Sequence, residues 1–454
     1  MPKNAQQNVA KLTTGSVGGS LGRMAALMSI GFAASAAFTV VDTYFVSELG
    51  TTELAAMGYI FPVNMVVFGL ALGLGVGTSA VLSRTIGKGD FRQVKRITVD
   101  SLILGIILVF ALIVIGLLTM KPLFSAMGAD AKTLKVIIEY MGIWYIGVGF
   151  LVIPMIGNSA MRATGDMLTP SMIMVTDLGL NIILDPILIR GYGPFDPMGI
   201  KGAAIATVFC RGLALVASLY FLVFRKKMLT REIPTLSAMF LSWKKILYIG
   251  LPAVLITVMM PASMAVVNRI LSGFGNEAVA AFGTAAKIER CVTIPIIALG
   301  SAMIPFVGQN WGAKLYGRVF QAQKTATIFA LAWGALAMLV IFGWARPLTA
   351  VFTDDPLVSK YLIMMLWITP VAFGFRGLGH VSSLSMNAIN CPWHSMGFML
   401  IRVLVFQLPM AYIAGRFWGL KSLIISLVVT DIITGIMASI WIYRLYVSKS
   451  KTAI

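Results

Sequence analysis

The sequence is poor in charged residues and in the residue types that build most enzyme and metal sites. Only 12% of its 454 residues are charged, and it has two histidines and three cysteines. A soluble globular protein carries roughly twice that charged fraction, so this class is excluded. His380 and His394 are isolated, and Cys210, Cys291 and Cys391 fall inside apolar segments without metal-ligand spacing. We predict packing or loop roles for them, with no metal site and no disulfide.

Enzymatic motifs are also missing. The chain has no glycine-rich phosphate loop ending in lysine, so ATP is not expected to drive it. It has no nucleophile elbow and no metal-binding histidine pair. We therefore predict that the protein is not an enzyme, holds no cofactor, and draws any energy it needs from an ion gradient.

What the chain has instead is long apolar segments. Hydrophobic residues make up 58% of it, and its mean hydropathy is +0.90. Lipid cannot satisfy exposed backbone polar groups and no barrel-like alternation is visible, so such segments must be helices. About twelve are long enough to cross a ~30 Å hydrocarbon core, namely 21–46, 54–80, 97–119, 134–157, 169–190, 199–224, 244–271, 279–305, 322–343, 360–386, 393–415 and 419–446. The predicted fold class is an all-α polytopic membrane protein.

The net charge of +19 describes membrane topology and does not indicate nucleic acid. With the N-terminus inside, one side of the membrane receives most of the lysines and arginines, whereas the opposite loops are sparser and include Glu48, Glu53 and Glu277. The basic side carries Lys3, Lys11, Arg23, Arg84, Lys88, Arg92, Lys95, Arg96, Arg225, Lys226, Lys227, Arg231, Lys244, Lys245, Lys314, Arg318, Lys324 and the tail 444–451. This pattern places both termini in the cytoplasm, with the first helix as a retained anchor in the inner (plasma) membrane.

The first half of the chain reappears in the second half. Several residues recur with the same type 225 positions later, for example Ser47 as Ser272 and Gly50 as Gly275. The polar, basic stretch 225–245 separates six apolar segments from six others, so the halves are parallel repeats. We predict two pseudo-symmetric six-helix bundles, residues 1–224 and 246–454, joined by a cytoplasmic linker at 225–245. Repeats of this kind are typical of transporters.

Acids inside the apolar segments are concentrated in the first half. Asp177, Asn181 and Asp185 follow one another at four-residue steps, which drift by only about 40° each on a helix and so share one face. A carboxylate in an apolar interior resists ionisation unless a cation binds it, and an amide tolerates both protonation states. With Asp42 on the first helix, such a group is suited to bind and release a proton or a monovalent cation. The alternative is that these acids lie near helix ends and touch interfacial water.

The second half holds deep basic residues. Lys287, Glu289 and Arg290 lie about ten residues into the eighth segment, and Arg402 about ten into the eleventh. These cations either line a substrate cavity or extend outward to water, and Glu289 alternatively neutralises its neighbours. Asp431 has no visible companion, and we predict a structural role for it.

Several motifs resemble those of the multidrug and toxic compound extrusion (MATE) family over essentially the whole chain. These are VDTYFVSELGTTELAAMG near the first helix, MRATGDMLTP at 161–170, NRILSGFGNEAVAAFGTAAKIERC opening the second half, and VGQNWGA at 307–313. The resemblance implies the family's twelve-helix fold of two bundles.

The acids resemble the DinF-like branch of that family, whose proton-linked site lies in the first half. By position the resemblance implies a coupling site of Asp42, Asn181, Asp185 and Thr207, to which we add Asp177. Predicted substrate-cavity residues are Asn158, Met174, Phe38, Ser35, Lys287 and Arg290. The NorM-like branch carries a membrane glutamate where this chain has Met260, which speaks against a sodium site in the second half. Leu27 replaces a proline that is common in the first helix, so any bend there must arise at Gly31 or its small neighbours.

The resemblance implies a secondary exporter that exchanges protons for small amphipathic, often cationic, organic compounds leaving the cytoplasm. Sodium coupling remains open, and a monomer is the expected state. The main alternative is a lipid or lipid-linked oligosaccharide flippase of the same superfamily, which the deep basic residues of the second half would suit. A channel or membrane receptor would lack counterflow.

Overall fold

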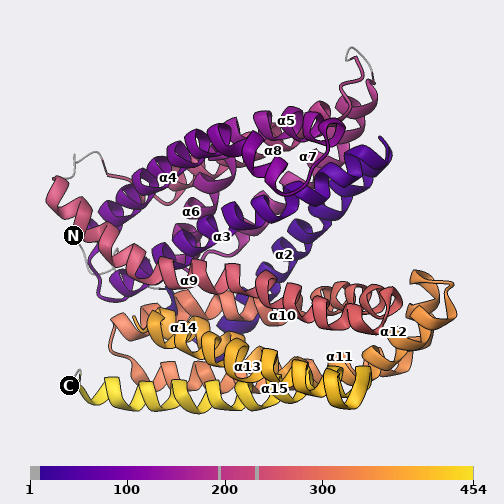
Figure 1. The fold of residues 1–454 in the computed structure, drawn as a ribbon. Coiled ribbons are helices and arrows are strands. Elements are labelled where there is room, and N and C mark those ends of the chain that lie inside the picture. Colours follow the sequence, from indigo (N-terminus) through magenta and orange to yellow (C-terminus); the bar gives the residue numbers. More distant parts are fainter. Residues whose placement is uncertain (1–10, 193–195, 231–234, 453–454) are drawn as a thin grey trace. The chain divides into compact units, whose positions relative to one another are not determined.

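The computed structural model describes residues 11–192, 196–230 and 235–452, and within them every regular element is a helix (Figure 1). The predicted basic residues Lys3 and Arg231 and part of the predicted linker lie outside the described residues. By the packing of its residues the chain forms two compact units. Residues 30–254 form one, here called the N-unit, and residues 1–29 with 255–454 form the other, the C-unit.

The chain passes from one unit to the other inside two long helices. The first passage falls between Ser29 and Ile30 of α2, and the second between Val254 and Leu255 of α9. The predicted bundles 1–224 and 246–454 instead place the division in the linker, and that division remains a prediction.

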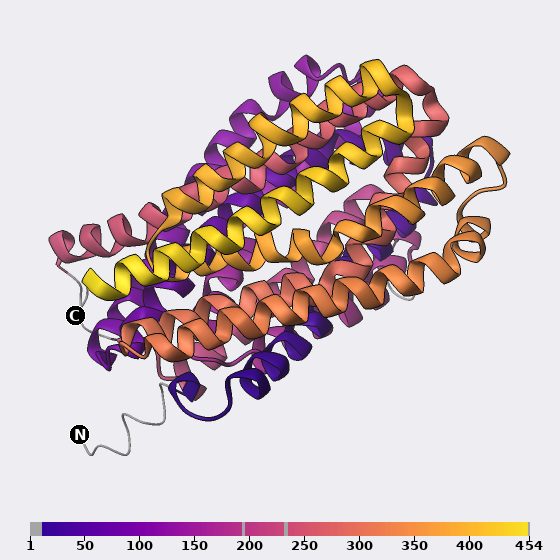
Figure 2. The same cartoon turned by 90° about the horizontal axis from the view of Figure 1, so that it is seen from below.

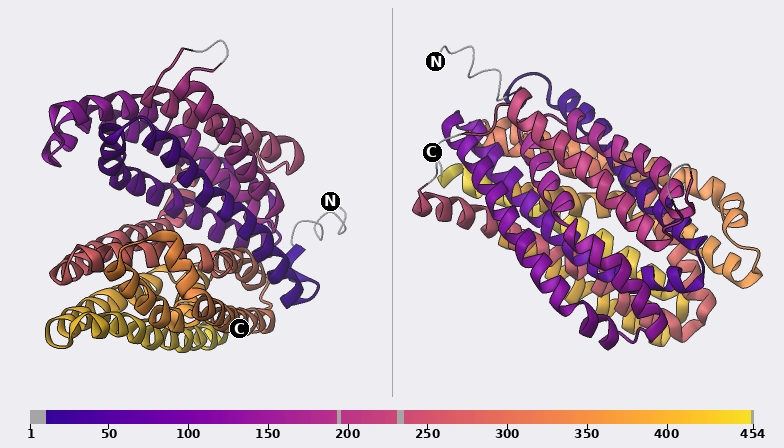
Figure 3. Two further views of the ribbon diagram at one scale, coloured as in Figure 1. Left: turned by 90° about the vertical axis from the view of Figure 1, so that its right-hand side faces the viewer. Right: turned by 90° about the horizontal axis from the view of Figure 1, so that it is seen from above.

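The N-unit is built from the helices of the first half, which lie side by side when viewed from above (Figure 3). Its elements are α2 (Val17–Ser47, shared with the C-unit), α3 (Thr51–Gly87), α4 (Phe91–Ala126), α5 (Ala131–Ile146), α6 (Gly149–Ala163), α7 (Leu168–Arg190), α8 (Ile200–Tyr220), the π-helical turn η2 (Phe221–Arg225) and the start of α9 (Leu236–Leu271). Here α3 packs on α6, α6 on α8, and α8 on both α5 and α7.

The C-unit is arranged around α13, which packs on α10, α11 and α15 (Figure 2). Its elements are η1 (Lys11–Thr13), the rest of α2 and α9, η3 (Ser272–Phe274), α10 (Asn276–Gly312), α11 (Tyr316–Phe352), α12 (Pro356–Ile368), η4 (Thr369–Ala372), α13 (Phe373–Ala388), α14 (Pro392–Leu400), the π-helical η5 (Ile401–Gln407) and α15 (Leu408–Thr452). Its core is aliphatic and aromatic, with Phe373, Leu423 and Met365 fully or nearly fully buried.

The all-helical membrane fold is confirmed. Among the described residues ten helices are long and apolar enough to cross a membrane, or eleven if the bent pair α5 and α6 counts as one span. The helical run Pro392–Lys451 is one of the ten, but Gly419 has a non-helical backbone (φ 81°, ψ −175°) at the point where the sequence separates its last two predicted segments. Positive φ is available to glycine without the clash of a Cβ, so the run turns there.

The glycine-rich run of α3 serves close helix packing. A Cβ at Gly73 or Gly77 would lie 2.7 Å or less from backbone atoms of α9, and one at Gly75 would meet the Ser159 side chain of α6 at 2.6 Å. In the equivalent run of α10, a Cβ at Gly300 would lie 2.6 Å from the His380 ring. The α3 run therefore brings two backbones together, as small residues do between membrane helices, whereas Gly300 leaves room for the His380 side chain.

The polar N-terminal segment is fastened to the C-unit by the motif VGQNWGA. Gln309 Oε1 accepts a hydrogen bond from the Leu12 amide at 3.2 Å, and Asn310 Nδ2 donates to the Leu12 carbonyl at 3.0 Å. Arg318 adds three hydrogen bonds to backbone carbonyls of residues 12–15. Gln309, Asn310 and Arg318 therefore hold the N-terminal segment in place by hydrogen bonds.

Asp166, in the motif MRATGDMLTP, ties the loop between α6 and α7 to Lys226, the residue that follows η2. Its Oδ2 lies 2.6 Å from Lys226 Nζ and also accepts from the Thr169 hydroxyl at 2.7 Å. Burial opposes ionisation of this carboxyl, but hydrogen bonds from Lys226 and Thr169 outweigh burial and hold its pKa below the usual value of 3.8.

A carboxyl with a lowered pKa stabilises the fold above its unfolded pKa, and that stabilisation is lost as pH falls through the folded pKa. Asp166→Asn should therefore lower stability by about 1 kcal/mol at neutral pH, measured as the thermal midpoint in detergent. The difference from wild type should shrink at acid pH, as the pH falls through the lowered pKa of the folded protein and the wild-type carboxyl becomes neutral as well. Lys226→Met should mirror it, whereas an equal deficit at both pH values would contradict this role.

Candidate functional site

Two buried carboxylates of the N-unit lie in one polar cluster that α2, α5, α7 and α8 build together. Asp42, on α2, is 7% exposed, and its Oδ1 accepts a hydrogen bond from the Thr207 hydroxyl of α8 at 3.4 Å. Tyr140 of α5 is also buried, and its hydroxyl interacts with Thr207 and with the charges of Asp42 and Asp185. The structure thus brings together residues that are about 165 positions apart in sequence.

The face of α7 predicted from the four-residue spacing is present. Asn181 and Asp185 are both fully buried, and Asn181 Nδ2 donates to Asp185 Oδ1 at 2.8 Å. Pro186 lies inside α7 without ending it, since the helix continues to Arg190. Among the described residues Asp185 Oδ2 and Asn181 Oδ1 have no hydrogen-bond partner. Two acceptor oxygens are therefore open toward a donor.

Asp177, one turn before Asn181, is held differently from the other two acids. Its Oδ2 forms a salt bridge of 3.0 Å with Arg211 Nη1 on α8. The Arg211 guanidinium lies over the Phe38 ring of α2, 4.6 Å from the ring centroid, which is a cation–π contact. Arg211 is four residues after Thr207, so both side chains lie on one face of α8. Arg211 compensates the charge of Asp177.

This arrangement can hold and release a small cation such as a proton. An ionised carboxylate that is buried and short of donors loses much of the hydration that stabilises its charge. Proton binding at the open Oδ2 of Asp185 removes the negative charge. The protonated oxygen then becomes a hydrogen-bond donor. Asn181 and Thr207 can hydrogen bond to either form, because amide and hydroxyl groups present both donors and acceptors.

The predicted cavity residues of the N-unit lie on α2, α6 and α7 and differ in how they relate to this cluster. Phe38 is buried beneath Arg211. Met174 is half-buried, and its sulfur would lie 3.0 Å from a Cβ on Gly31, so α2 and α7 approach closely there. Asn158 is 7% exposed on α6 and Ser35 is half-buried on α2. In the described part of the chain neither side chain hydrogen bonds to the two carboxylates, and their cavity role stays a prediction.

The C-unit contains a second group of charges, which form ion pairs across four elements. Asp431 of α15 accepts hydrogen bonds from Arg376 of α13 at 2.8 Å and from Arg402 of η5 at 2.7 Å. Arg376 also forms a salt bridge with Glu289 of α10. Two arginines therefore face two carboxylates, and the charges within the group compensate one another.

Lys287 and Arg290, the predicted cavity cations, are exposed on α10, while Glu289 between them points toward Arg376. Glu289 thus pairs with another helix, and among the described residues it forms no salt bridge with Lys287 or Arg290. Arg402 pairs with Asp431, which has two companions where the sequence suggested none. The role of Lys287 and Arg290 remains a prediction.

Three side chains of these two clusters were not predicted from the sequence. Arg211 and Arg376 are charged residues deep inside predicted spans, and that depth was a signal. Arg211 also stands one turn from Thr207. Tyr140 gave no signal, because a tyrosine near the end of a membrane helix is typical of the interface.

A family model and several relatives match the chain. The MatE family model matches residues 28–187 and 252–413. A protein of Shewanella oneidensis described as an FAD transporter is 37% identical over 90% of both chains. The multidrug export protein MepA of Staphylococcus saprophyticus is 25% identical over 93% of this chain and 94% of its own.

A solved structure also matches the fold of this chain. The crystal structure of the Vibrio cholerae MATE transporter VcmN in the bent form matches with a TM-score of 0.90 and 27% identity, covering 99% of each chain.

Proposed function

As this chain belongs to the MatE family of transporters, we propose that it is a proton-coupled antiporter of the DinF-like branch that exports organic compounds. The observation that carries the proposal is the enclosed cluster of the N-unit. Asp42 and Asp185 are buried among polar groups that suit both protonation states, and an acceptor oxygen of Asp185 lacks a donor among the described residues. Asp177 is already compensated by Arg211.

In the proposed cycle the ionised cluster accepts an amphipathic, often cationic compound from the cytoplasm. Protons that enter from outside neutralise Asp42 and Asp185, rearrange their hydrogen bonds to Asn181 and Thr207, and lower the affinity for the compound. This antagonism must be reciprocal, because linkage makes each ligand weaken the other equally. The site is then re-exposed by rocking of the bundles.

The two helices that pass between the units are the natural hinges for this motion. The passage in α2 lies next to Gly31, and the passage in α9 lies next to Pro252. Glycine and proline weaken a helix locally, by backbone freedom and by a missing hydrogen bond respectively. Bending at these points would move one unit without unfolding it.

Two cargo classes are proposed. Similarity to MepA over nearly the whole chain favours amphipathic drugs. The higher identity to a protein described as an FAD transporter favours a flavin dinucleotide, whose aromatic ring system is amphipathic and whose pyrophosphate is anionic. Protonation would weaken the binding of a cationic cargo, because it removes negative charge from the site. For an anionic cargo, proton binding would have to lower the affinity through the change in conformation.

We also propose that the chain works as a monomer in the inner (plasma) membrane with both termini in the cytoplasm. The excess of lysine and arginine on one side of the spans supports this orientation.

Transport into inverted membrane vesicles tests the proposal. A fluorescent cationic dye and FAD should be supplied separately, with pH and sodium gradients imposed one at a time. Uphill uptake of either cargo on an acid-inside step, without sodium, is expected. Uptake that follows sodium alone would refute proton coupling, and cargo movement that never exceeds equilibrium would refute antiport.

A further inference from the structure

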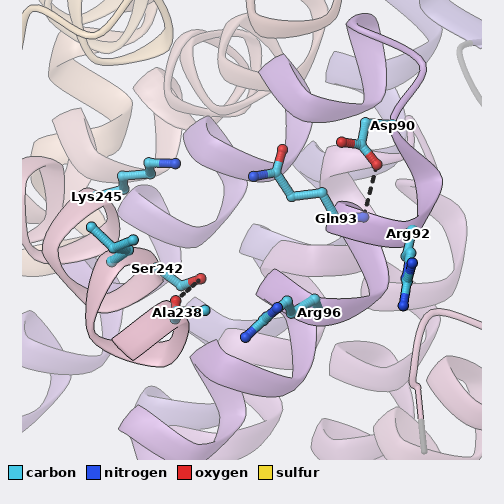
Figure 4. A pocket seen from close by; sticks show the side chains of 8 residues that line it. Asp90, Arg92, Gln93, Arg96, Ala238, Ser242 and Lys245 are labelled. Atoms are coloured by element: carbon cyan, nitrogen blue, oxygen red, sulfur yellow. Dashed lines mark hydrogen bonds between the residues drawn. The ribbon is translucent and has the colours of Figure 1, made fainter. Parts of the chain in front are cut away.

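A basic cavity lies in the N-unit away from the acidic cluster, between the beginning of α4 and the beginning of α9 (Figure 4). Its volume is about 460 Å³. It is lined by Asp90, Arg92, Gln93, Arg96, Ala238, Leu241, Ser242 and Lys245. Three cationic side chains from two helices, about 150 positions apart in sequence, therefore face one space, and Asp90 is the single carboxylate among the described residues that line it.

That carboxylate is directed into the helix and not across the cavity. Asp90 is the N-cap of α4, and its Oδ1 accepts the Gln93 amide at 3.0 Å (Figure 4). The negative charge of a capping carboxylate stabilises the first turn of its own helix. It forms no salt bridge with a cavity cation in the described part of the chain.

Arg96 supplies an unused donor inside the cavity wall. Its Nε is buried and has no hydrogen-bond partner among the described residues. Its only hydrogen bond among them is a weak one of 3.5 Å from Nη2 to the Thr235 hydroxyl. A buried donor without a partner costs free energy that an incoming acceptor oxygen would recover. An arginine fork is suited to two oxygens of one phosphate.

The two walls of the cavity are fixed to each other. Trp243 Nε1, on α9, donates to the Asp100 carbonyl of α4 at 2.8 Å. Ser242 is buried, and its hydroxyl is satisfied by the Ala238 carbonyl at 3.2 Å. The space is therefore preformed, and its volume is in the range of ordinary ligand sites.

Three bulky apolar side chains are exposed beside the cavity. Leu236, Phe240 and Leu241, on the first turns of α9, are 69%, 60% and 57% exposed. Bulky apolar side chains beside lysine and arginine at the end of a membrane span are typical of a helix that lies in the interface. A ligand here would thus meet cations in the cavity and an apolar strip beside it.

We propose that this cavity binds the phosphate head group of an anionic phospholipid, whose acyl chains lie along the exposed face of α9. The chemistry of both parts fits. Three cations and an open arginine donor suit a phosphodiester, and basic pockets between membrane helices recognise anionic head groups in this way. The exposed apolar side chains argue against a soluble phosphate as the ligand, because they would contribute nothing to its binding. The proposal does not depend on the coupling ion or the cargo.

Lipid retention by the purified full-length chain tests it. Native mass spectrometry should compare phosphatidylglycerol with phosphatidylcholine for wild type, Lys245→Gln, and the triple variant Arg92→Gln, Arg96→Gln, Lys245→Gln. Each cation near an anionic head group strengthens binding by roughly fivefold, so the triple variant should lose roughly a hundredfold in preference for phosphatidylglycerol. Lys245 is exposed, so its single variant should fold and should lose about fivefold.

A matched variant, Lys88→Gln, Lys95→Gln, Lys244→Gln, removes three charges from the same region without touching the lining, and it should keep the preference. Equal losses in the lining and matched variants would overturn the proposal, because they would show general surface charge only. Displacement of the lipid by an equal concentration of sn-glycerol 3-phosphate would also overturn it, in favour of a soluble phosphate ligand.

Discussion

Replacing Asp42 with asparagine should abolish uphill transport while leaving the protein in the membrane. Asparagine keeps the size of the side chain and can still accept the Thr207 hydrogen bond, but it cannot bind and release a proton in the cycle. If Asp42 couples the proton to the cargo, the pH-driven gradient of dye or FAD should fall by at least roughly tenfold. Asp185→Asn should have an effect of the same size, measured in the same inverted vesicles.

The control is Glu139→Gln on α5, one residue before Tyr140. Glu139 lies toward the surface, where its Oε1 is 3.8 Å from Lys201 Nζ, and its loss should leave transport nearly unchanged. Thr207→Val should slow transport without abolishing it, because the carboxylate remains.

Cargo affinity gives a second readout that separates coupling from damage. In wild type the affinity should weaken as the pH falls, because the proton and the cargo compete. In Asp42→Asn this pH dependence should shrink while binding persists. A variant that retains full pH-driven accumulation would show that Asp42 does not carry the proton. One that loses binding at every pH would point to a structural role.

The sequence was informative where a property repeats along one helix. Apolar segments identified the spans, and four-residue spacing placed Asn181 beside Asp185, because helical geometry relates such positions without any knowledge of neighbours. The close contact between Gly77 and the α9 backbone was not predictable in this way, because it depends on how two helices that are far apart in sequence pack together.

Partners on different helices were not predictable in the same way. The sequence showed no companion for Asp431, because Arg376 and Arg402 lie 55 and 29 positions away in sequence. A membrane charge requires compensation, but the sequence does not say from which helix it comes. The same applies to Tyr140, whose hydroxyl meets Thr207 only through the packing of α5 on α8.

Removing the charge of Asp431 should destabilise the C-unit strongly. The carboxylate is 3% exposed and faces two arginines whose side chains are only 30% and 15% exposed. Asp431→Asn leaves these cations without full compensation, and breaking one partner of a buried ion pair costs about 3–5 kcal/mol. The thermal midpoint in detergent should fall accordingly, whereas Asp354→Asn, an exposed acid of the same unit, should change it little.

The double variant Asp431→Asn, Arg402→Met decides whether the loss comes from the ion pairs. Methionine removes the stranded cation and keeps an apolar stem of similar length, so it should restore part of the stability that Asp431→Asn removes. Additive losses would mean that the two side chains act independently. If the single variant were as stable as wild type but lost transport, Asp431 would belong to the transport cycle and would not hold α13, η5 and α15 together.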